Sequence, residues 1–353
     1  MTLFLSFHHL FSIKIHSSDP KFESLMRSEY PNFIVPEAGE PDLEIRFGPF
    51  VKEKLASWKP FFDYEYADDA VYGQKHYKTA RWQTAILGLS RPQTTLYFDG
   101  NRHSLIFFIG EILEPLMRYK LVEKGVALIH SSCVASEGKG VLISGIRHTG
   151  KTLVMLKALV DGAELLSDDY TFVNAARQLY AYPKKVNFFV THFREIPALK
   201  PYWKRLSRFE KSKMLLYYLI RRLTGDYAVL GHQQFITDLI PTVSLRDSAP
   251  LKKIVLLTTR PGESFSVRKN VPLREAVAKL AANNQWECRE FQKMLIAYAY
   301  ENQQAFAHEW LLHEARLISK MVDGVVTIEF SIPDFTPGTL NRYLRAVEEE
   351  VLK

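Results

Sequence analysis

One short stretch, LISGIRHTGKTLVML at residues 142–156, constrains the fold of this chain more than any other feature. It places the pattern G-x-x-x-x-G-K-T, from Gly145 to Thr152, between an apolar run and a run with helical spacing. A strand, a glycine loop and a helix in that order let backbone N–H groups converge on phosphate oxygens at the N-terminus of the helix. The stretch therefore predicts an α/β domain with a phosphate-binding loop. A glycine turn that joins strand to helix by chance is the alternative.

The residue types in this loop predict what its members do. Gly145 and Gly150 let the backbone approach the phosphates of a nucleotide. Lys151 is placed to reach the outer phosphates, and the hydroxyl of Thr152 is a ligand for Mg²⁺. The loop alone therefore predicts a bound nucleotide but not what the nucleotide is used for.

Two adjacent carboxylates, Asp168 and Asp169, follow the apolar run AELL, about one helix and one turn beyond the loop. A carboxylate at the end of such a strand can hold the Mg²⁺ that bridges the outer phosphates. Because adjacent carboxylates repel each other, one of them can carry a raised pKa and accept a proton from a substrate hydroxyl. The pair is therefore a candidate metal ligand and general base, and a polar turn at a strand end is the alternative.

A histidine, His130, interrupts the apolar run VALIHSSCVA. This run and GVLISG are separated by the turn SEGKG, a pattern that predicts a β-hairpin leading into the glycine loop. In such a hairpin the two strands run side by side, which would bring His130 near the mouth of the loop. A core or strand-end histidine with satisfied hydrogen bonds is the alternative.

The two parts of the chain differ in their patterns. Residues 1 to about 110 form short strand-like runs separated by turns, the first of them at the N-terminus, and a helical spacing follows that ends at Gly125. Beyond it, strand-like and helix-like runs alternate, which is typical of α/β domains. We therefore predict a strand-rich domain at residues 1–118 and an α/β nucleotide-binding domain at residues 119–353, in a chain that is α+β overall.

Composition limits the class of protein and its compartment. With 47% hydrophobic and 24% charged residues, and without an apolar run of bilayer length, the chain is expected to be globular and to lack a transmembrane segment. The apolar N-terminus lacks the basic segment and cleavage site of a signal peptide, and the two cysteines suit a reducing interior. We therefore expect a cytoplasmic protein.

The net charge of +7 is concentrated in one segment. Between Lys200 and Arg222 there are eight lysines and arginines and a single acid, Glu210, mixed with leucines in a pattern that predicts an amphipathic helix. A solvated face of a structural helix, a peptide or small-protein partner, an anionic membrane surface and a nucleic acid are the alternatives, in that order. No nucleic acid is expected, because the aromatic residues lack an RNA-binding arrangement.

The order of the motifs resembles that of a known family. In LIHSSCVASEGKGVLISGIRHTGKTLVMLKALVDGAELLSDDYTFV, residues 128–173, a strand histidine precedes the phosphate loop, and a helix and an Asp-Asp pair follow it. This arrangement is similar to the core of HPr kinase/phosphorylase and its relatives, which share the phosphoenolpyruvate carboxykinase-type nucleotide fold. The similarity covers about residues 112–190, including AYPKKVNF.

The resemblance implies ATP and Mg²⁺ as cofactors and assigns the site residues. It implies that the whole loop, His148 and Thr149 included, binds the phosphates of ATP. It also implies that Thr152 and Asp169 hold Mg²⁺. Asp168, assisted by His130, would then deprotonate the hydroxyl that attacks the γ-phosphate.

Departures from the family pattern bear on the substrate. Leu153 stands where HPr kinase has a glutamate, and the later arginine- and glycine-containing signature of the phosphorolytic reaction has no counterpart. The chain looks closer to relatives that sit beside peptide-maturation systems, including kinases that phosphorylate a serine in the tail of a lasso-peptide precursor. We therefore expect a serine kinase that acts on a peptide or small protein. The alternatives are a kinase for free serine or another metabolite, and an ATPase that binds peptides as a chaperone does.

Four cations beyond the core motifs are candidates for contact with the substrate or with the transferred phosphoryl group: Arg194, Lys204, Arg205 and Arg260. An arginine often stabilises charge in phosphoryl transfer. Pairing with surface carboxylates is the alternative for each of them. Relatives often assemble, so a homo-oligomer is compatible with the resemblance.

Overall fold

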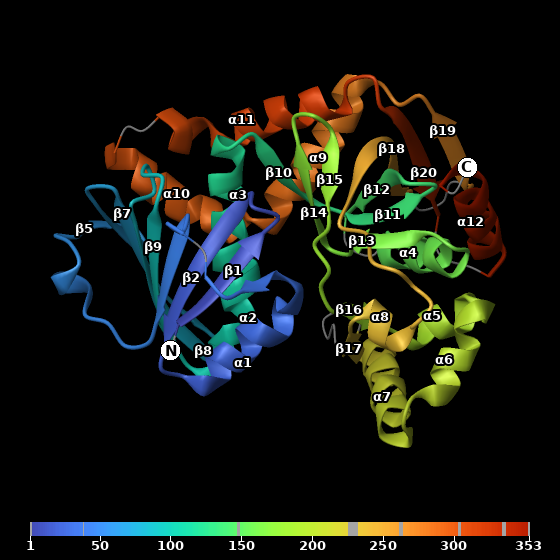
Figure 1. The fold of residues 1–353 in the computed structure, drawn as a ribbon, viewed down its shortest axis with the longest axis horizontal. Coiled ribbons are helices and arrows are strands. Elements are labelled where there is room, and N and C mark those ends of the chain that lie inside the picture. Colours follow the sequence, from blue (N-terminus) through green and yellow to red (C-terminus); the bar gives the residue numbers. More distant parts are fainter. Residues whose placement is uncertain are drawn as a thin grey trace. The chain divides into compact units, whose positions relative to one another are not determined.

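The computed structural model describes residues 2–37, 39–146, 149–224, 232–260, 264–302, 305–333 and 337–351 (Figure 1). The chain divides into two compact units, which we describe separately. Unit 1 comprises residues 1–127 and 284–317, and unit 2 comprises residues 128–283 and 318–353. In the described parts of the chain, no helix combines the length and the apolar character needed to cross a membrane.

Unit 1 contains a nine-stranded sheet in the order β3-β1-β2-β4-β9-β8-β7-β6-β5. The neighbours of β4 on both sides are parallel to it, and the remaining pairs are antiparallel. Buried and less buried residues alternate along strands such as β1, which is the pattern that predicted them. The strands are β1 (Thr2–Phe7), β2 (Phe11–Ser17), β3 (Ile34–Val35), β4 (Leu43–Phe47), β5 (Lys59–Phe61), β6 (Tyr64–Ala67), β7 (Ala70–Tyr77), β8 (Ala80–Leu87) and β9 (Thr94–Gly100).

Helices accompany this sheet, and some of them come from the distant C-terminal part of the chain. The π-helical segment η4 (Phe108–Leu113) leads into α3 (Glu114–Glu123), which ends before Gly125 as predicted. The other helices that lie at least partly in unit 1 are α1 (Pro20–Glu29), α2 (Leu105–Phe107), the end of α9 (Leu273–Glu287), α10 (Arg289–Asn302) and the first part of α11 (Ala305–Val322). Single 3₁₀ turns occur at Pro31–Phe33, Lys52–Lys54 and Arg102–Ser104.

The compact units differ from the predicted domains in two respects. The predicted boundary at residue 118 falls inside α3, and residues 284–317 belong to unit 1 rather than to the nucleotide-binding part. The physical reason is a buried ion pair between Arg118 on α3 and Glu314 on α11. The guanidinium of Arg118 also lies 5.1 Å from the ring centre of Trp310. These contacts join segments 196 residues apart, which local sequence patterns do not reveal.

Unit 2 is built on a second sheet in the order β10-β14-β15-β18-β12-β11-β13, with β20 pairing to β18 and to β19. Strands β12, β18 and β20 are parallel, so their carboxyl ends lie at one edge. The strands are β10 (Val126–His130), β11 (Ser132–Ser136), β12 (Lys139–Gly145), β13 (Glu164–Ser167), β14 (Tyr170–Asn174), β15 (Gln178–Tyr180), β18 (Ser248–Thr259), β19 (Ser266–Lys269) and β20 (Val326–Ile332). A separate hairpin pairs β16 (Val186–Phe188) with β17 (His232–Gln234).

An apolar cluster joins the sheet of unit 2 to several of its helices. It includes Ile143 of β12, Met155 of α4, Phe193 of α5, Met214 of α7 and Tyr343 of α12. Figure 1 shows α5, α6, α7 and α8 grouped together. The helices are α4 (Lys151–Val160), α5 (Val190–Glu195), α6 (Lys200–Arg205), α7 (Arg208–Thr224), α8 (Ile236–Leu239), α9 (Leu273–Glu287) and α12 (Pro337–Glu350), with a 3₁₀ turn at Pro197–Leu199.

The predicted fold class is confirmed, since unit 1 is rich in strands and unit 2 alternates strands and helices. One local prediction was too simple. The basic segment forms two helices, α6 and α7, instead of one, because Ser207 and Glu210 form a capping box between them. The Ser207 hydroxyl accepts from the Glu210 N–H at 3.1 Å, and the Glu210 carboxylate accepts from the Ser207 N–H at 2.8 Å.

Candidate active site

The glycine loop connects β12 to α4 as predicted, and the structure requires glycine at both of its ends. A Cβ atom at Gly145 would lie 2.6 Å from the Thr149 hydroxyl and 2.7 Å from the Leu257 carbonyl oxygen. Gly150 has a φ of +87°, a left-handed conformation that other residues rarely adopt, and it caps α4. The chain therefore bends tightly enough to present the N-terminus of a ten-residue helix to a ligand.

Side chains of the loop pack against its own backbone. The Thr149 hydroxyl donates to the Ile146 carbonyl at 2.7 Å, and the Lys151 ammonium donates to the Gly145 carbonyl at 2.6 Å. These two hydrogen bonds keep the loop curved, and the Lys151 side chain lies across the loop. His148, which the resemblance assigned to phosphate binding, lies outside the described residues, as does Arg147.

Asp168 lies beside the hydroxyl of Thr152. Its carboxylate accepts from the Ser132 hydroxyl at 2.5 Å, and its second oxygen lies 3.5 Å from the Thr152 hydroxyl oxygen. Burial raises the pKa of Asp168 to about 6, against the opposing effects of the Ser132 hydrogen bond and the Lys151 charge. The Asp168 carboxyl is buried away from water and lies beside a hydroxyl of the phosphate loop, so it is a suitable ligand for a cation.

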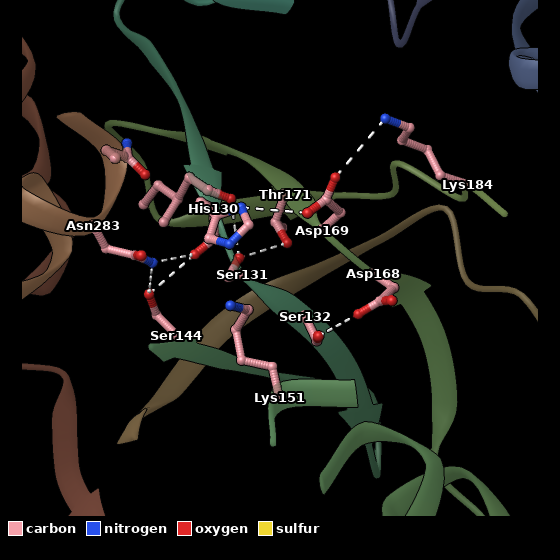
Figure 2. A network of polar contacts seen from close by, with 12 residues as sticks. His130, Ser131, Ser132, Ser144, Lys151, Asp168, Asp169, Thr171, Lys184 and Asn283 are labelled. Carbon is pink, nitrogen blue, oxygen red and sulfur yellow. Dashed lines mark hydrogen bonds and ion pairs between the residues drawn. The ribbon is translucent and has the colours of Figure 1, made fainter. Parts of the chain in front are cut away.

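Asp169 turns to a different set of partners. One of its carboxylate oxygens lies 3.4 Å from Nδ1 of His130, and the other lies 3.9 Å from the Lys184 ammonium. Figure 2 shows Asp169 between these two side chains, while Asp168 points toward Ser132. The Asp169 side chain is 49% exposed and that of His130 only 5%. The Asp169 carboxylate is therefore accessible to a substrate, and the buried imidazole of His130 lies next to it.

The backbone at Asp169 explains why the two aspartates diverge. Asp169 has a φ of +84° between β13 and β14, an uncommon conformation for a residue with a side chain. Its carbonyl accepts from the Ser131 N–H at 3.0 Å, which fixes the turn against the end of β10. The strained turn directs the two neighbouring carboxylates to different partners, and strain of this kind is common at functional sites.

A network of buried hydroxyls and one amide supports the site (Figure 2). The Thr171 hydroxyl lies 2.9 Å from that of Ser131 and 2.6 Å from that of Ser167. The side-chain amide of Asn283, on α9, donates to the His130 carbonyl at 3.0 Å and to the Ser144 hydroxyl at 3.1 Å. These contacts hold the end of β10 against β12 and so set the position of His130.

The predicted core residues come together, but with different pairings from those implied by the resemblance. Lys151, Thr152 and both aspartates lie at the loop and at the turn between β13 and β14. The resemblance joined Thr152 to Asp169 and His130 to Asp168. The distances join Thr152 to Asp168 and His130 to Asp169. The predicted hairpin is present as β11 and β12, but His130 lies outside it at the end of β10, which pairs with β14.

Several residues of this site are not predicted by the motifs. Among them, Ser132, Lys184 and Asn283 contact the aspartates or the histidine backbone. Ser132 stands in the quoted run directly after His130, and Lys184 stands in the quoted stretch AYPKKVNF, so both were within the similar region. Asn283 lies on a distant helix, and its position along the chain gives no signal.

The four candidate substrate cations lie at different places in unit 2. Arg260 follows β18, whose Leu257 is in register with Gly145, so it lies at the same sheet edge as the loop. Arg194 on α5 pairs with Glu195 at 2.5 Å. Lys204 and Arg205 are exposed on α6, where the guanidinium of Arg205 lies 5.5 Å from the ring centre of Tyr202. A contact of any of these four with a substrate remains a prediction.

The donor set fits a nucleotide-linked Mg²⁺ better than a metal held by protein alone. Among the described residues there is no group of three or more His, Cys, Asp or Glu that could hold a metal ion. Magnesium in kinases usually takes one or two carboxylates, a hydroxyl and phosphate oxygens, and keeps several waters. Asp168 and Thr152 could supply the two protein ligands, and the phosphates could bind at the N-terminus of α4, which begins at Lys151.

Comparisons with known proteins add little to this geometry. No family model matches the chain, and no curated protein matches its sequence. Among solved structures, the chain is similar to the Hpr(Ser) kinase/phosphatase from Coxiella burnetii, with 10% sequence identity and a TM-score of 0.29 over 64% of this chain and 96% of that one. At a TM-score this low, the similarity shows neither the family nor the function of this chain.

Proposed function

We propose that this protein is an ATP- and Mg²⁺-dependent kinase that transfers the γ-phosphate to a serine-type hydroxyl of a peptide or small protein. One observation carries the proposal. At the edge of one sheet, the phosphate loop brings the Thr152 hydroxyl to Asp168, while an exposed Asp169 is backed by His130. A phosphate site, a cation site and a proton acceptor are the three elements that phosphoryl transfer to a hydroxyl needs.

Residues of the loop and Asp168 hold the nucleotide end. The backbone from Gly145 to Gly150 and the N-terminus of α4 bind the phosphates, and Lys151 moves from the Gly145 carbonyl to the outer phosphates. Thr152 and Asp168 hold Mg²⁺, which neutralises charge on the β- and γ-phosphates when it is bound.

Asp169 takes the proton of the acceptor. Its exposed carboxylate accepts the hydroxyl proton while the hydroxyl oxygen bonds to the γ-phosphorus and the bond from that phosphorus to the β-phosphate oxygen breaks, which releases ADP. His130 orients the carboxylate through Nδ1, and the Lys184 ammonium lies 3.9 Å from its other oxygen. This assignment exchanges the two aspartates relative to the roles that the family resemblance implies.

Transfer of labelled phosphate tests the proposal. The purified chain is incubated with γ-labelled ATP, Mg²⁺ and either serine-containing peptides or free serine, and the products are identified by mass spectrometry. We expect label on a peptide serine, and none with Lys151→Ala, because that variant lacks the cation for the outer phosphates. The tail of a lasso-peptide precursor, which only the resemblance implies, belongs in the peptide set.

Two outcomes contradict the proposal in different ways. Label that appears only on free serine shows a metabolite kinase with the same core. Label that goes only to water, with every peptide present, shows an ATPase that uses hydrolysis for conformational change. In either case the nucleotide site is retained and the acceptor is wrong.

A further inference from the structure

Helix α7 presents a stripe of apolar side chains to solvent. The exposed apolar residues are Phe209, Leu215, Leu216, Leu219 and Leu223, which are between 49% and 77% exposed. Because successive helical residues are rotated by about 100°, these five positions fall within an arc of about 120°. We call them the α7 stripe. Met214, on a different side of the helix, is buried in the apolar cluster of unit 2, so α7 is anchored while its stripe faces outward.

The charges around the α7 stripe have one sign. Arg208 and Lys213 are exposed on the same helix, and Lys204 and Arg205 are exposed on the neighbouring α6. The single acid of this segment, Glu210, is engaged within the chain, because it caps α7 through Ser207 and lies 3.7 Å from His232. The surface therefore combines an exposed apolar stripe with a border of cations.

We propose that the α7 stripe binds an acidic amphipathic helix of the substrate, a segment separate from the hydroxyl that receives the phosphate. The inference rests on the proposed function in one respect, namely that the substrate is a peptide or small protein. Leucines that recur at intervals of three, four and seven residues form the narrow seam by which two helices pack. Acidic residues beside the partner's own apolar stripe would face Arg208 and Lys213 and set its orientation.

The structure argues against one other occupant. A second copy of α7 would place cations against cations, which disfavours pairing of this chain with itself at this surface. A helix that lies in a membrane interface also combines phenylalanine and leucine with cations. The vesicle measurement below separates that occupant from the acidic helix, which the spacing of Leu216, Leu219 and Leu223 favours.

A helix bound to α7 would be held on the unit that carries the phosphate loop. Met214 of α7 and Met155 of α4 belong to the same apolar cluster, so the docking surface and the loop share one core. Binding at the stripe therefore raises the effective concentration of a tethered serine at the site without requiring contacts around that serine. A substrate recognised in this way is expected to be acidic outside the segment that is phosphorylated.

A synthetic acidic helix is the probe. A fluorescent peptide of about three heptads, with leucines in the seam positions and glutamates beside them, is titrated with the full-length protein and followed by anisotropy. We expect saturable binding that weakens at least about 10-fold with the exposed double substitution Leu216→Ser/Leu219→Ser, because apolar contact is lost. Lys213→Glu should also weaken binding. Ile106→Ser, at an exposed apolar position on α2 in unit 1, is the control and should leave binding unchanged.

The same titrations contain the results that overturn the docking surface. Equal binding of a scrambled peptide of the same composition, or equal binding by the double variant, shows that the stripe does not recognise an apolar seam. Stripe-dependent binding to vesicles of phosphatidylserine and phosphatidylcholine, without binding of the acidic helix, shows a membrane surface. Unchanged thermal unfolding of each variant is required, and Lys213→Glu provides the comparison if the double variant fails to fold.

The docking surface and the proposed function fail separately. Lys151→Ala should bind the probe as the wild type does, because Lys151 lies in the loop and not on α7. Absence of phosphoryl transfer together with stripe-dependent binding contradicts the kinase and supports the docking surface. Phosphoryl transfer to peptides without stripe-dependent binding supports the kinase and overturns the docking surface.

Discussion

Both units withdraw charged side chains from water, but they treat them differently. In unit 1 the buried guanidinium of Arg118 meets the carboxylate of Glu314, the carbonyl of Asn284 and, at 3.0 Å, the sulfur of Cys288. In unit 2 Asp168 has a hydroxyl partner in Ser132, and its pKa rises to about 6. The ion pair in unit 1 compensates the buried charge and stabilises the fold. In unit 2 the ionised form of Asp168 lowers the stability of the fold until a cation or substrate binds beside it.

The largest effect is expected at the candidate active site, where the proposed function gives each aspartate a chemical role. Replacing Asp169 with Asn removes the proton acceptor, and we expect a fall in kcat of about 10²–10⁴-fold, the usual contribution of a general base. Asp168→Asn should instead raise the Mg²⁺ concentration needed for half-maximal activity, because a cation ligand is lost. Transfer rates measured across a Mg²⁺ titration separate the two.

Rescue by Mg²⁺ decides between the assignments. Saturating Mg²⁺ should restore a substantial part of the activity of Asp168→Asn and none of that of Asp169→Asn. The reverse result would return the base to Asp168, as the family resemblance implies, and would mean that the partners of the aspartates in this structure do not indicate their roles.

The next effect concerns the stability of unit 1. Arg118→Met leaves Glu314 buried without its cation, and we expect the free energy of unfolding to fall by about 3–5 kcal/mol. The double variant Arg118→Met/Glu314→Leu should recover much of this loss, since it buries neither charge. Urea unfolding of the three proteins measures both values. A loss below about 1 kcal/mol for the single variant would show that the pair does not hold α3 to α11.

Removing the buried charge of Asp168 in unit 2 is expected to change the free energy of unfolding by less than Arg118→Met does, and to raise it instead of lowering it. Because the pKa of Asp168 is raised to about 6, protonation favours the folded state, so the wild type loses stability as the pH rises from about 4 through 6. Asp168→Asn should therefore be more stable than the wild type at pH 8, by about 2–3 kcal/mol from a shift of about two pKa units. The two proteins should have nearly equal stability at pH 4.

Urea unfolding in the presence of a chelator at both pH values measures this difference. Ser132→Ala is the matched control, since it removes the hydroxyl that stabilises the ionised carboxylate and should lower the stability at pH 8. An Asp168→Asn variant that is less stable than the wild type at pH 8 would show that the carboxylate is as well satisfied as Arg118.

The sequence predicted what depends on local pattern. The loop, the α4 helix and the strands on either side of Asp168 follow from spacing, because strand and helix periods are local. The sequence could not predict which aspartate faces Thr152. The answer depends on the positive φ of Asp169, and the neighbouring residues do not indicate that φ is positive there. The capping box that separates α6 from α7 was visible as S-x-x-E at Ser207, within a run that was otherwise interpreted as one helix.

The buried ion pair of unit 1 could not be predicted from local sequence patterns either. Arg118 and Glu314 lie 196 residues apart, and an arginine in a helix is ordinarily a solvated residue. Its burial follows from the packing of α3 against helices that the chain supplies only near its C-terminal end. The assignment of residues 284–317 to unit 1 depends on such contacts, so strand and helix patterns alone could not place the boundary.

The smallest effect is expected for a charge pair that water already satisfies. Arg46 and Glu44 are 2.8 Å apart on β4, with the arginine side chain about half exposed. Arg46→Ala should change the free energy of unfolding by less than about 0.5 kcal/mol, because solvent screens the pair in both states. The measurement is the same urea titration, with Arg46→Lys as a control that keeps the charge. A loss comparable to that of Arg118→Met would break the comparison, since burial would then not be what separates structural charges from surface ones.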